Sequence, residues 1–345
     1  MGFSGTGGHY TLGPTVRVDI DCIDTVLPEV SDTLRHTGCT MLLGLVVSTR
    51  PEELIDSVMS DLSENRHLNE TLELQACWHA AYVRTGEDYA LWFGPGAPEG
   101  GNEQFGLHGW ETGRIAPITN SATMVDYIRE GTLPDINREE TLRPLRETNP
   151  HFTLNELEVL ERVASSAANE IDRDGGIGMP RTAGRRYDAA DVREDASLVL
   201  AETEGVEMDV LRQDWELLLT VGTWMSTTRL RDLVLASFLE NPKPAEHVLL
   251  AVAQSFHETA RSNSLCLYAA VLIARKFSMR TGLVLATVLE EDPNHSLAKL
   301  MMQAYRSGLH DWLVDALTEG SNQAQDSLTT MLDDDDEPDE AGVAA

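Results

Sequence analysis

Apolar and polar positions repeat with two different periods along the first 150 residues, and these periods predict strands interleaved with helices. Alternation with a period of two indicates a strand, whereas apolar residues three and four positions apart indicate a helix. The run from Met41 to Val47 is almost continuously apolar and predicts a strand buried on both faces. We expect strands over residues 16–20, 41–47, 72–83 and 88–93, and helices over residues 23–36 and 54–62.

The order of these elements, β-α-β-α-β-β, is typical of an α/β domain. It favours a mostly parallel sheet with right-handed crossover helices and one antiparallel pair at its end. Residues 1–14 are rich in glycine, so we expect a loop or a frayed edge there.

A Gly- and Pro-rich stretch over residues 94–113 interrupts this pattern and predicts a long loop. Two short helices are expected after the loop, over residues 121–130 and 138–146. Pro150 then indicates a boundary, because the residue before a proline disfavours helix. We therefore assign residues 1–150 to the α/β domain.

From residue 151 onward the helical period of 3.6 dominates, which predicts an all-α, helical-bundle domain over residues 151–320. A flexible connection is expected over residues 172–187, and an acidic disordered tail over residues 321–345. The helices are expected over residues 153–171, 189–203, 208–221, 226–240, 245–261, 264–276, 278–290, 294–306 and 309–318.

The segment 278–306 has the pattern of a tetratricopeptide-like helical hairpin. Its two helices are separated by Asp-Pro-Asn, and small residues at Gly282, Ala286 and Ala298 allow the helices to approach closely. One such hairpin is too little for a free-standing solenoid, so we expect it to be part of the bundle.

The chain is strongly acidic: 57 Asp and Glu against 26 Lys and Arg give a formal net charge of −31. Residues 1–150 carry 23 acids and 10 bases, and residues 333–340 carry seven acids, so the charge is spread along the chain. Such a surface repels phosphate backbones and anionic lipids, which argues against direct nucleic-acid or membrane binding. Solubility, salt adaptation and mimicry of DNA remain as alternative reasons for the acidity.

The sequence also indicates a compartment. Its four cysteines, in a chain of 345 residues, do not form a disulfide framework. The N-terminal residues do not have the pattern of a secretory signal. The longest apolar run, from Leu265 to Ala274, is well below the roughly 20 residues of a membrane-spanning helix. We therefore expect a cytoplasmic protein.

Motifs that carry chemistry are incomplete. His257 and Glu258 begin a zinc-protease pattern, but Arg261 stands where the second histidine would be. The glycine-rich stretches at residues 5–8 and 94–96 do not have the context of a phosphate-binding loop, and no Gly-x-Ser-x-Gly elbow occurs. We therefore predict no catalytic residue, no metal site and no cofactor.

One polar and aromatic group in the long loop is a candidate for ligand binding, because loops at the ends of strands often bind ligands. An ordered loop of purely structural role is the alternative interpretation. The candidate residues are His108, Trp110, Glu111 and Arg114.

Four stretches of the chain are similar to a known family. They are VRVDIDCIDTVLPEVSDTLRHTGCTMLLGLVVS (16–48), ACWHAAYVRTGEDYALW (76–92), TNSATMVDYIREGTLPDINREETLRPL (119–145) and RTGLVLATVLEEDPNHSLAKLMMQAYRSGL (280–309). With them the chain resembles the actinobacterial domain-of-unknown-function 4192 family over residues 12–318. The resemblance implies a lineage, high-GC actinobacteria or their phages, and implies no activity.

These observations leave three hypotheses for function, and they do not fix an oligomeric state. The first is a non-enzymatic protein-interaction or regulatory module, in which the helical domain binds a protein partner. The second is an enzyme or small-ligand-binding protein that uses the loop over residues 94–114. The third is an acidic DNA mimic that acts on a nucleic-acid-binding protein.

Overall fold

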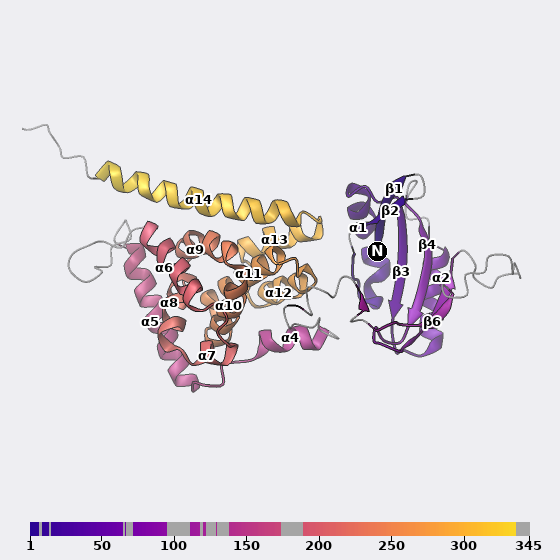
Figure 1. Ribbon diagram of the computed structural model, residues 1–345, viewed down its shortest axis with the longest axis horizontal. Helices are drawn as coiled ribbons and strands as arrows, with labels where there is room; N and C mark the ends of the chain where they lie inside the picture. The colour runs from indigo at the N-terminus through magenta and orange to yellow at the C-terminus, as the bar shows by residue number, and fades with distance from the viewer. Residues whose placement is uncertain are drawn as a thin grey trace, which may run out of the picture. The chain divides into compact units, whose positions relative to one another are not determined.

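The chain folds into two compact units, Met1–Ile136 and Asn137–Ala345, in the computed structural model (Figure 1). The structure describes residues 1–6, 9–13, 15–64, 66, 72–94, 111–117, 120–121, 129, 138–173 and 189–335. Most of the predicted loop over 94–113, the predicted helix over 121–130 and the predicted connection over 172–187 lie outside the described residues.

The units divide earlier than the boundary expected at Pro150, because the short helix α4 (Arg138–Arg146) belongs to the second unit. Leu142 and Leu145 of α4 are buried in the helical core. Pro150 therefore lies inside the second unit and does not coincide with the division between the units.

The first unit contains a six-stranded sheet with the order β2-β1-β3-β4-β5-β6. Among the described strands, β3 and β4 are parallel and the other four neighbouring pairs are antiparallel. The predicted mostly parallel sheet was therefore wrong: the sheet is mixed and mostly antiparallel. The strands are β1 (Gly2–Thr6), β2 (His9–Leu12), β3 (Met41–Val47), β4 (Leu74–Ala80), β5 (Asp88–Phe93) and β6 (Thr112–Arg114).

The change of topology comes from the first 14 residues, which were predicted as a loop or a frayed edge and which supply the paired strands β1 and β2. Strand β1 pairs with β3, with Gly2 opposite Leu42. In the predicted β-α-β order, the strand over residues 16–20 would have lain beside β3 at this position. The predicted strand over 16–20 was also wrong. Glycine is needed inside this hairpin, because a Cβ at Gly5 would collide with the carbonyl oxygen of His9.

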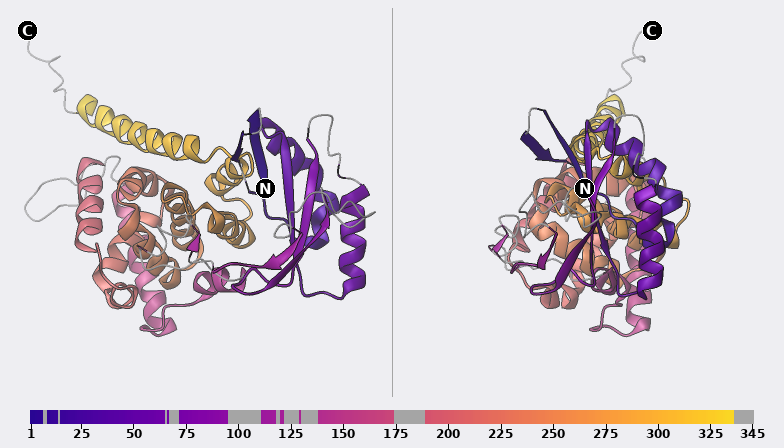
Figure 2. Two further views of the ribbon diagram at one scale, coloured as in Figure 1. Left: turned by 45° about the vertical axis from the view of Figure 1, so that its right-hand side comes forward. Right: turned by 90° about the vertical axis from the view of Figure 1, so that its right-hand side faces the viewer.

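Two helices, α1 (Ile23–His36) and α2 (Glu52–Glu64), share one core with the sheet (Figure 2). Leu34 of α1 and Met59 of α2 pack with Leu42 of β3 in that core. The opposite face of β3 leaves Leu45 43% and Val47 46% exposed. The prediction that this strand is buried on both faces was therefore wrong, because its apolar run supplies a core on one face only.

The second unit is largely helical, as the period of 3.6 predicts. After α4 it contains α5 (Leu154–Arg173), α6 (Ala189–Glu202), α7 (Met208–Gln213), α8 (Trp215–Met225), α9 (Thr228–Glu240), α10 (Pro242–Ser255), α11 (Glu258–Ala274), α12 (Ser278–Glu291), α13 (Ser296–Arg306) and α14 (His310–Asp335).

Three predicted boundaries in this unit differ from the structure. The break expected between helices over residues 245–261 and 264–276 lies inside α11, because α10 ends at Ser255 and α11 begins at Glu258. The helix expected over residues 208–221 is divided into α7 and α8 at Asp214, whose carboxylate accepts a hydrogen bond from the Leu217 N–H at 3.0 Å and caps α8. The tail expected from residue 321 begins inside α14. Ser321 is 3% exposed, and its hydroxyl accepts a hydrogen bond from the Ala236 N–H of α9 at 3.1 Å.

Helix α11 is the centre of the helical core (Figure 1). The apolar run noted in the sequence, Leu265 to Ala274, lies in α11, which is buried on nearly all sides by neighbouring helices. Near the start of α11, the side chain of Arg261 bonds to three other helices, α4, α10 and α12. Its guanidinium donates at 2.6 Å to the carbonyl of Leu145 and at 2.6 Å to that of Ala253, and it pairs with Glu291 of α12.

Helices α12 and α13 form the expected helical hairpin. The close approach predicted at Gly282 is confirmed, because a Cβ there would lie 2.9 Å from Cε1 of Tyr305 on α13. Ala298, the small residue predicted on the second helix, is fully buried at the same hairpin. The ring of Tyr305 also stacks on His310, with the centroids 5.2 Å apart, and so links the hairpin to α14.

Candidate functional site

The sequence pattern singles out four residues of the long loop: His108, Trp110, Glu111 and Arg114. His108 and Trp110 lie outside the described residues. The Glu111 carbonyl accepts a hydrogen bond from the Leu91 N–H at 2.5 Å, and Arg114 Nε donates to Asp88 Oδ1 at 3.0 Å. These two residues therefore join β5 to β6. The Arg114 and Asp88 side chains are 77% and 80% exposed, so their ion pair contributes about 0–1 kcal/mol.

The cysteines Cys77 and Cys266 are buried and poorly placed for thiol chemistry. Burial raises the pKa of the Cys77 thiol, and that of the Cys266 thiol, to about 12. Both thiols are therefore protonated near neutral pH and are poor nucleophiles. Among the described residues, no group of three or more His, Cys, Asp or Glu could hold a metal ion.

A buried polar network joins three helices in the second unit. The Arg231 guanidinium, on α9, donates to its neighbour Asp232 at 2.6 Å and to Asn263 Oδ1 of α11 at 2.8 Å. Asn263 Nδ2 in turn donates to the Met225 carbonyl at 2.7 Å. Arg231 is therefore both buried and paired, as a charge in a protein core must be.

His295 completes this network and is held in one neutral tautomer. Its Nδ1 accepts a hydrogen bond from the Ala298 N–H at 3.1 Å and caps α13, so the proton is on Nε2. Nε2 lies 3.0 Å from Asn263 Oδ1 and donates to it. Burial and the nearby Arg231 lower the pKa of His295. We interpret this network as structural, because its members are hydrogen-bonded to one another and Arg231, Asn263 and His295 are buried in the core.

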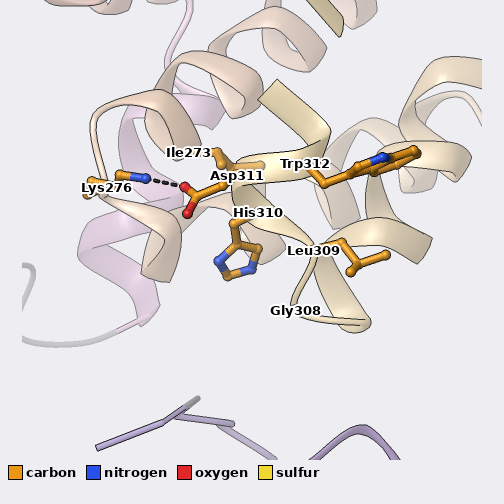
Figure 3. Close-up of a pocket in the computed structure, with 7 residues that line it drawn as sticks. All are labelled: Ile273, Lys276, Gly308, Leu309, His310, Asp311 and Trp312. Carbon is orange, nitrogen blue, oxygen red and sulfur yellow. Dashed lines mark hydrogen bonds and ion pairs between the residues drawn. The ribbon is translucent and has the colours of Figure 1, made fainter. Parts of the chain in front are cut away.

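A hollow of about 440 Å³ opens on the surface where α11 ends, α13 ends and α14 begins (Figure 3). One ion pair, between Lys276 and Asp311, crosses its edge. The lining residues are Ile273, Lys276, Gly308, Leu309, His310, Asp311 and Trp312.

Both helices that end at the hollow do so in the same way. In α11, Lys276 adopts φ +64°, with its N–H on the Ile273 carbonyl and the Phe277 N–H on the Leu272 carbonyl. In α13, Gly308 adopts φ +70° with the equivalent pair of hydrogen bonds. These are Schellman motifs, which end a helix sharply and turn the chain away. The hollow is the space left between the two turns and the start of α14.

Two large apolar side chains are exposed at this point. Trp312 is 61% exposed and Leu309 is 48% exposed. They extend to the same side of the chain, away from the pair between Lys276 and Asp311 (Figure 3). An exposed tryptophan beside an exposed leucine is unusual on a surface of this charge and marks a candidate binding surface, which we call the Trp312 surface.

Sequence periodicity missed the Trp312 surface. The pattern predicted a helix over residues 309–318 and did not distinguish its buried apolar residues from its exposed ones. In the structure the buried face of α14 passes through Leu313, which is 4% exposed, and Trp312 lies beside that face rather than on it. The signal in the sequence was an aromatic residue directly before the buried leucine, with Asp311 immediately before it and Asp315 three positions after it.

The helix that carries Trp312 is acidic throughout. The 26 residues of α14 contain seven Asp and Glu and neither lysine nor arginine. Asp315 and Glu319 follow Trp312 at positions i+3 and i+7, so all three lie on one face of the helix, and both carboxylates are exposed. An aromatic side chain is therefore followed along α14 by two negative charges.

Comparison with known proteins gives one match. The family described as a domain of unknown function (DUF4192) matches residues 1–311. The chain belongs to this family. The DUF4192 match covers the whole first unit and the second unit as far as Asp311, including the Schellman turns at the hollow, and it ends one residue before Trp312. Neither the curated proteins nor the solved structures contain a match to this DUF4192 chain.

In the described parts of the chain, none of the helices combines the length and the apolar composition that are needed to cross a bilayer.

Proposed function

We propose that the chain is a non-enzymatic protein-interaction module that binds its partner at the Trp312 surface. The observation that carries this proposal is the exposure of Trp312 beside Leu309 at the edge of a hollow. Tryptophan is the residue type most enriched among those that dominate binding energy at protein interfaces. Burying one such side chain contributes about 2 kcal/mol or more.

The surrounding architecture supports a docking role. Helix α13 packs against both α12 and α14, and the finer interpretation as a tetratricopeptide-like unit belongs to this proposal. Such hairpins present their binding residues on rigid helices, which lowers the entropy lost on binding. Here the stack between Tyr305 and His310 fixes the start of α14 against the hairpin.

The other two hypotheses receive less support from the described residues. For a ligand site at the loop over 94–114, Glu111 and Arg114 are used in joining strands. For a DNA mimic, carboxylates would have to stand in rows like phosphates. Instead, arginines pair with many of them across the surface, for example Arg84 with Glu87 and Arg143 with Glu147.

A crosslinking experiment tests the proposal. A photo-crosslinking amino acid is placed at position 312, and a control is placed at Leu154, which is 69% exposed on α5 in the same unit. We expect position 312 to crosslink to one defined protein in a native lysate. The purified partner should then bind the full chain, and Trp312→Ala should weaken binding about tenfold or more. Equal crosslinking from both positions would reject the proposal. An affinity of the purified partner that Trp312→Ala leaves unchanged would also reject it.

A further inference from the structure

We infer that the partner segment bound at the Trp312 surface is a basic amphipathic helix. This inference rests on the proposed function and names the chemistry of the partner. An apolar side chain of the helix covers Trp312 and Leu309, and its lysines or arginines lie against Asp315 and Glu319. Three observations support it: the placement of the apolar anchor, the charge beside it, and the type of secondary structure around it.

The apolar anchor is compact and lies at one end of an acidic helix. Trp312 and Leu309 are on the same side of the hollow (Figure 3), which itself has room for an inserted side chain. Asp315 and Glu319 extend from Trp312 along the exposed face of α14 in one direction only. A partner must therefore place an apolar group first and its cations one and two helical turns further on.

The local charge selects a cationic partner. Lys276 is paired with Asp311, and Arg306 lies in the last turn of α13, where it offsets the negative end of that helix. The sequence of α14 contains neither lysine nor arginine, and Arg193 of α6 donates to Asn322 and Gln325, beyond Glu319 along the helix. One oxygen of Glu319 accepts a hydrogen bond from Gln323 at 3.2 Å, a neutral donor that leaves the charge in place.

The same charge argues against a second copy of this chain as the occupant. Two copies would each bring a formal net charge of −31 to the interface, and like charges of that size oppose association. A basic segment gains from the same field, which also speeds its diffusional approach.

The secondary structure around the surface favours a helix over an extended segment. An extended peptide obtains much of its affinity by pairing its backbone with the edge of a sheet. In the described residues of the second unit every regular element is a helix, so no sheet edge is offered there. Docking must then use side chains, and a helix presents apolar and basic side chains at the spacing of Trp312, Asp315 and Glu319.

The test uses the full chain and synthetic peptides of about 15 residues, long enough to form a helix on binding. The main probe is a fluorescent peptide of leucine and lysine with leucines on one helical face. The first control peptide has the same composition in scrambled order, and the second has glutamate in place of lysine. Binding is measured by fluorescence anisotropy at two salt concentrations.

Three variants separate this site from the general acidity of the surface. We expect Trp312→Ala to weaken binding of the leucine–lysine helix about tenfold. The double change Asp315→Asn with Glu319→Gln should weaken it about fivefold and reduce its salt dependence. The matched control, Glu158→Gln with Glu170→Gln, removes two exposed charges from α5 and should leave binding within about twofold.

Each outcome decides the inference. Equal binding of the scrambled peptide, equal effects of the α5 and α14 double variants, or preference for the glutamate peptide would each overturn it. Absence of any peptide binding would overturn it too. If position 312 still crosslinks to a lysate protein in that case, the proposed function stands and only the partner chemistry is wrong. If crosslinking also fails, both are rejected.

Discussion

The Nδ1 atom of His295 accepts a hydrogen bond from the N–H of Ala298 and caps helix α13 with a neutral imidazole. Protonation of Nδ1 would remove that acceptor and place a second positive charge near Arg231. The groups of opposite sign that face the ring are Asp232 and Asp292. Desolvation is the largest influence, and the pKa of His295 is therefore lowered.

This cap makes the stability of the helical unit depend on pH. Below the ordinary histidine pKa of about 6.5, the unfolded chain takes up a proton that folded His295 resists, so the free energy of unfolding falls as the pH drops. The variant His295→Asn keeps a capping side chain and should flatten this dependence between about pH 7 and pH 5. Urea unfolding at several pH values measures it, with exposed His247→Gln as control. An unchanged slope for His295→Asn would contradict the assignment.

A buried hydroxyl without a partner marks a place where the core can be improved. Thr281 is fully buried, and its Oγ1 has no hydrogen-bond partner in the described structure. Thr281→Val removes a desolvated polar group at nearly constant volume and should stabilise the chain by about 1 kcal/mol. The control is Thr223→Val, since Thr223 Oγ1 donates to the Leu219 carbonyl at 2.7 Å. We expect Thr223→Val to lower the free energy of unfolding by up to about 1 kcal/mol. The midpoints of thermal unfolding of the two variants, compared with that of the unchanged chain, test both expectations.

Two glycines inside helices should respond in opposite ways to alanine. A Cβ at Gly222 of α8 would collide with the buried ring of Phe256, so Gly222→Ala should cost about 1–3 kcal/mol. A Cβ at Gly320 of α14 meets nothing within 4 Å. Gly320→Ala should therefore stabilise by about 0.5–1 kcal/mol through helix propensity. The denaturant midpoints of the two variants should move apart, and a shift in the same direction would disprove this packing argument.

The Schellman turns at the hollow predict a further pair of opposite effects. Lys276 adopts a left-handed conformation that costs a non-glycine residue about 1 kcal/mol, and its exposed pair with Asp311 contributes little. Lys276→Gly should therefore leave stability unchanged or raise it by about 0.5 kcal/mol. Gly308→Ala, at the equivalent turn, should lower it by about 1–2 kcal/mol. A large loss for Lys276→Gly would instead show that the ion pair dominates.

Local patterns in the sequence predicted most helices well. The predicted bounds of α1, residues 23–36, agree with the observed ones. Its apolar residues face a single core, so the stretch over which the helical period continues coincides with the helix. The paired strands of the sheet were less predictable. Whether β1 or another segment pairs with β3 depends on contacts about 40 residues apart, which leave no local pattern.

The candidate site was largely beyond sequence reasoning for a different reason. Exposure of Trp312 follows from where two Schellman turns direct the chain, and a non-glycine residue such as Lys276 gives no local signal of a left-handed turn. Of the loop residues predicted instead, Arg114 pairs with the carboxylate of Asp88 on β5.

The hydrogen bonds of Arg261 limit where a stable fragment of the second unit can begin. The Arg261 guanidinium bonds to the Leu145 carbonyl, to the Ala253 carbonyl and to Glu291. Leu145, more than a hundred residues before Arg261 in the sequence, therefore supplies one of the hydrogen-bond acceptors that hold the start of α11. A protein fragment that began after Pro150 would lose that acceptor. It would also expose the part of the helical core that Leu142 and Leu145 cover. The shortest fragment able to retain the Trp312 surface on an intact support therefore begins at Asn137.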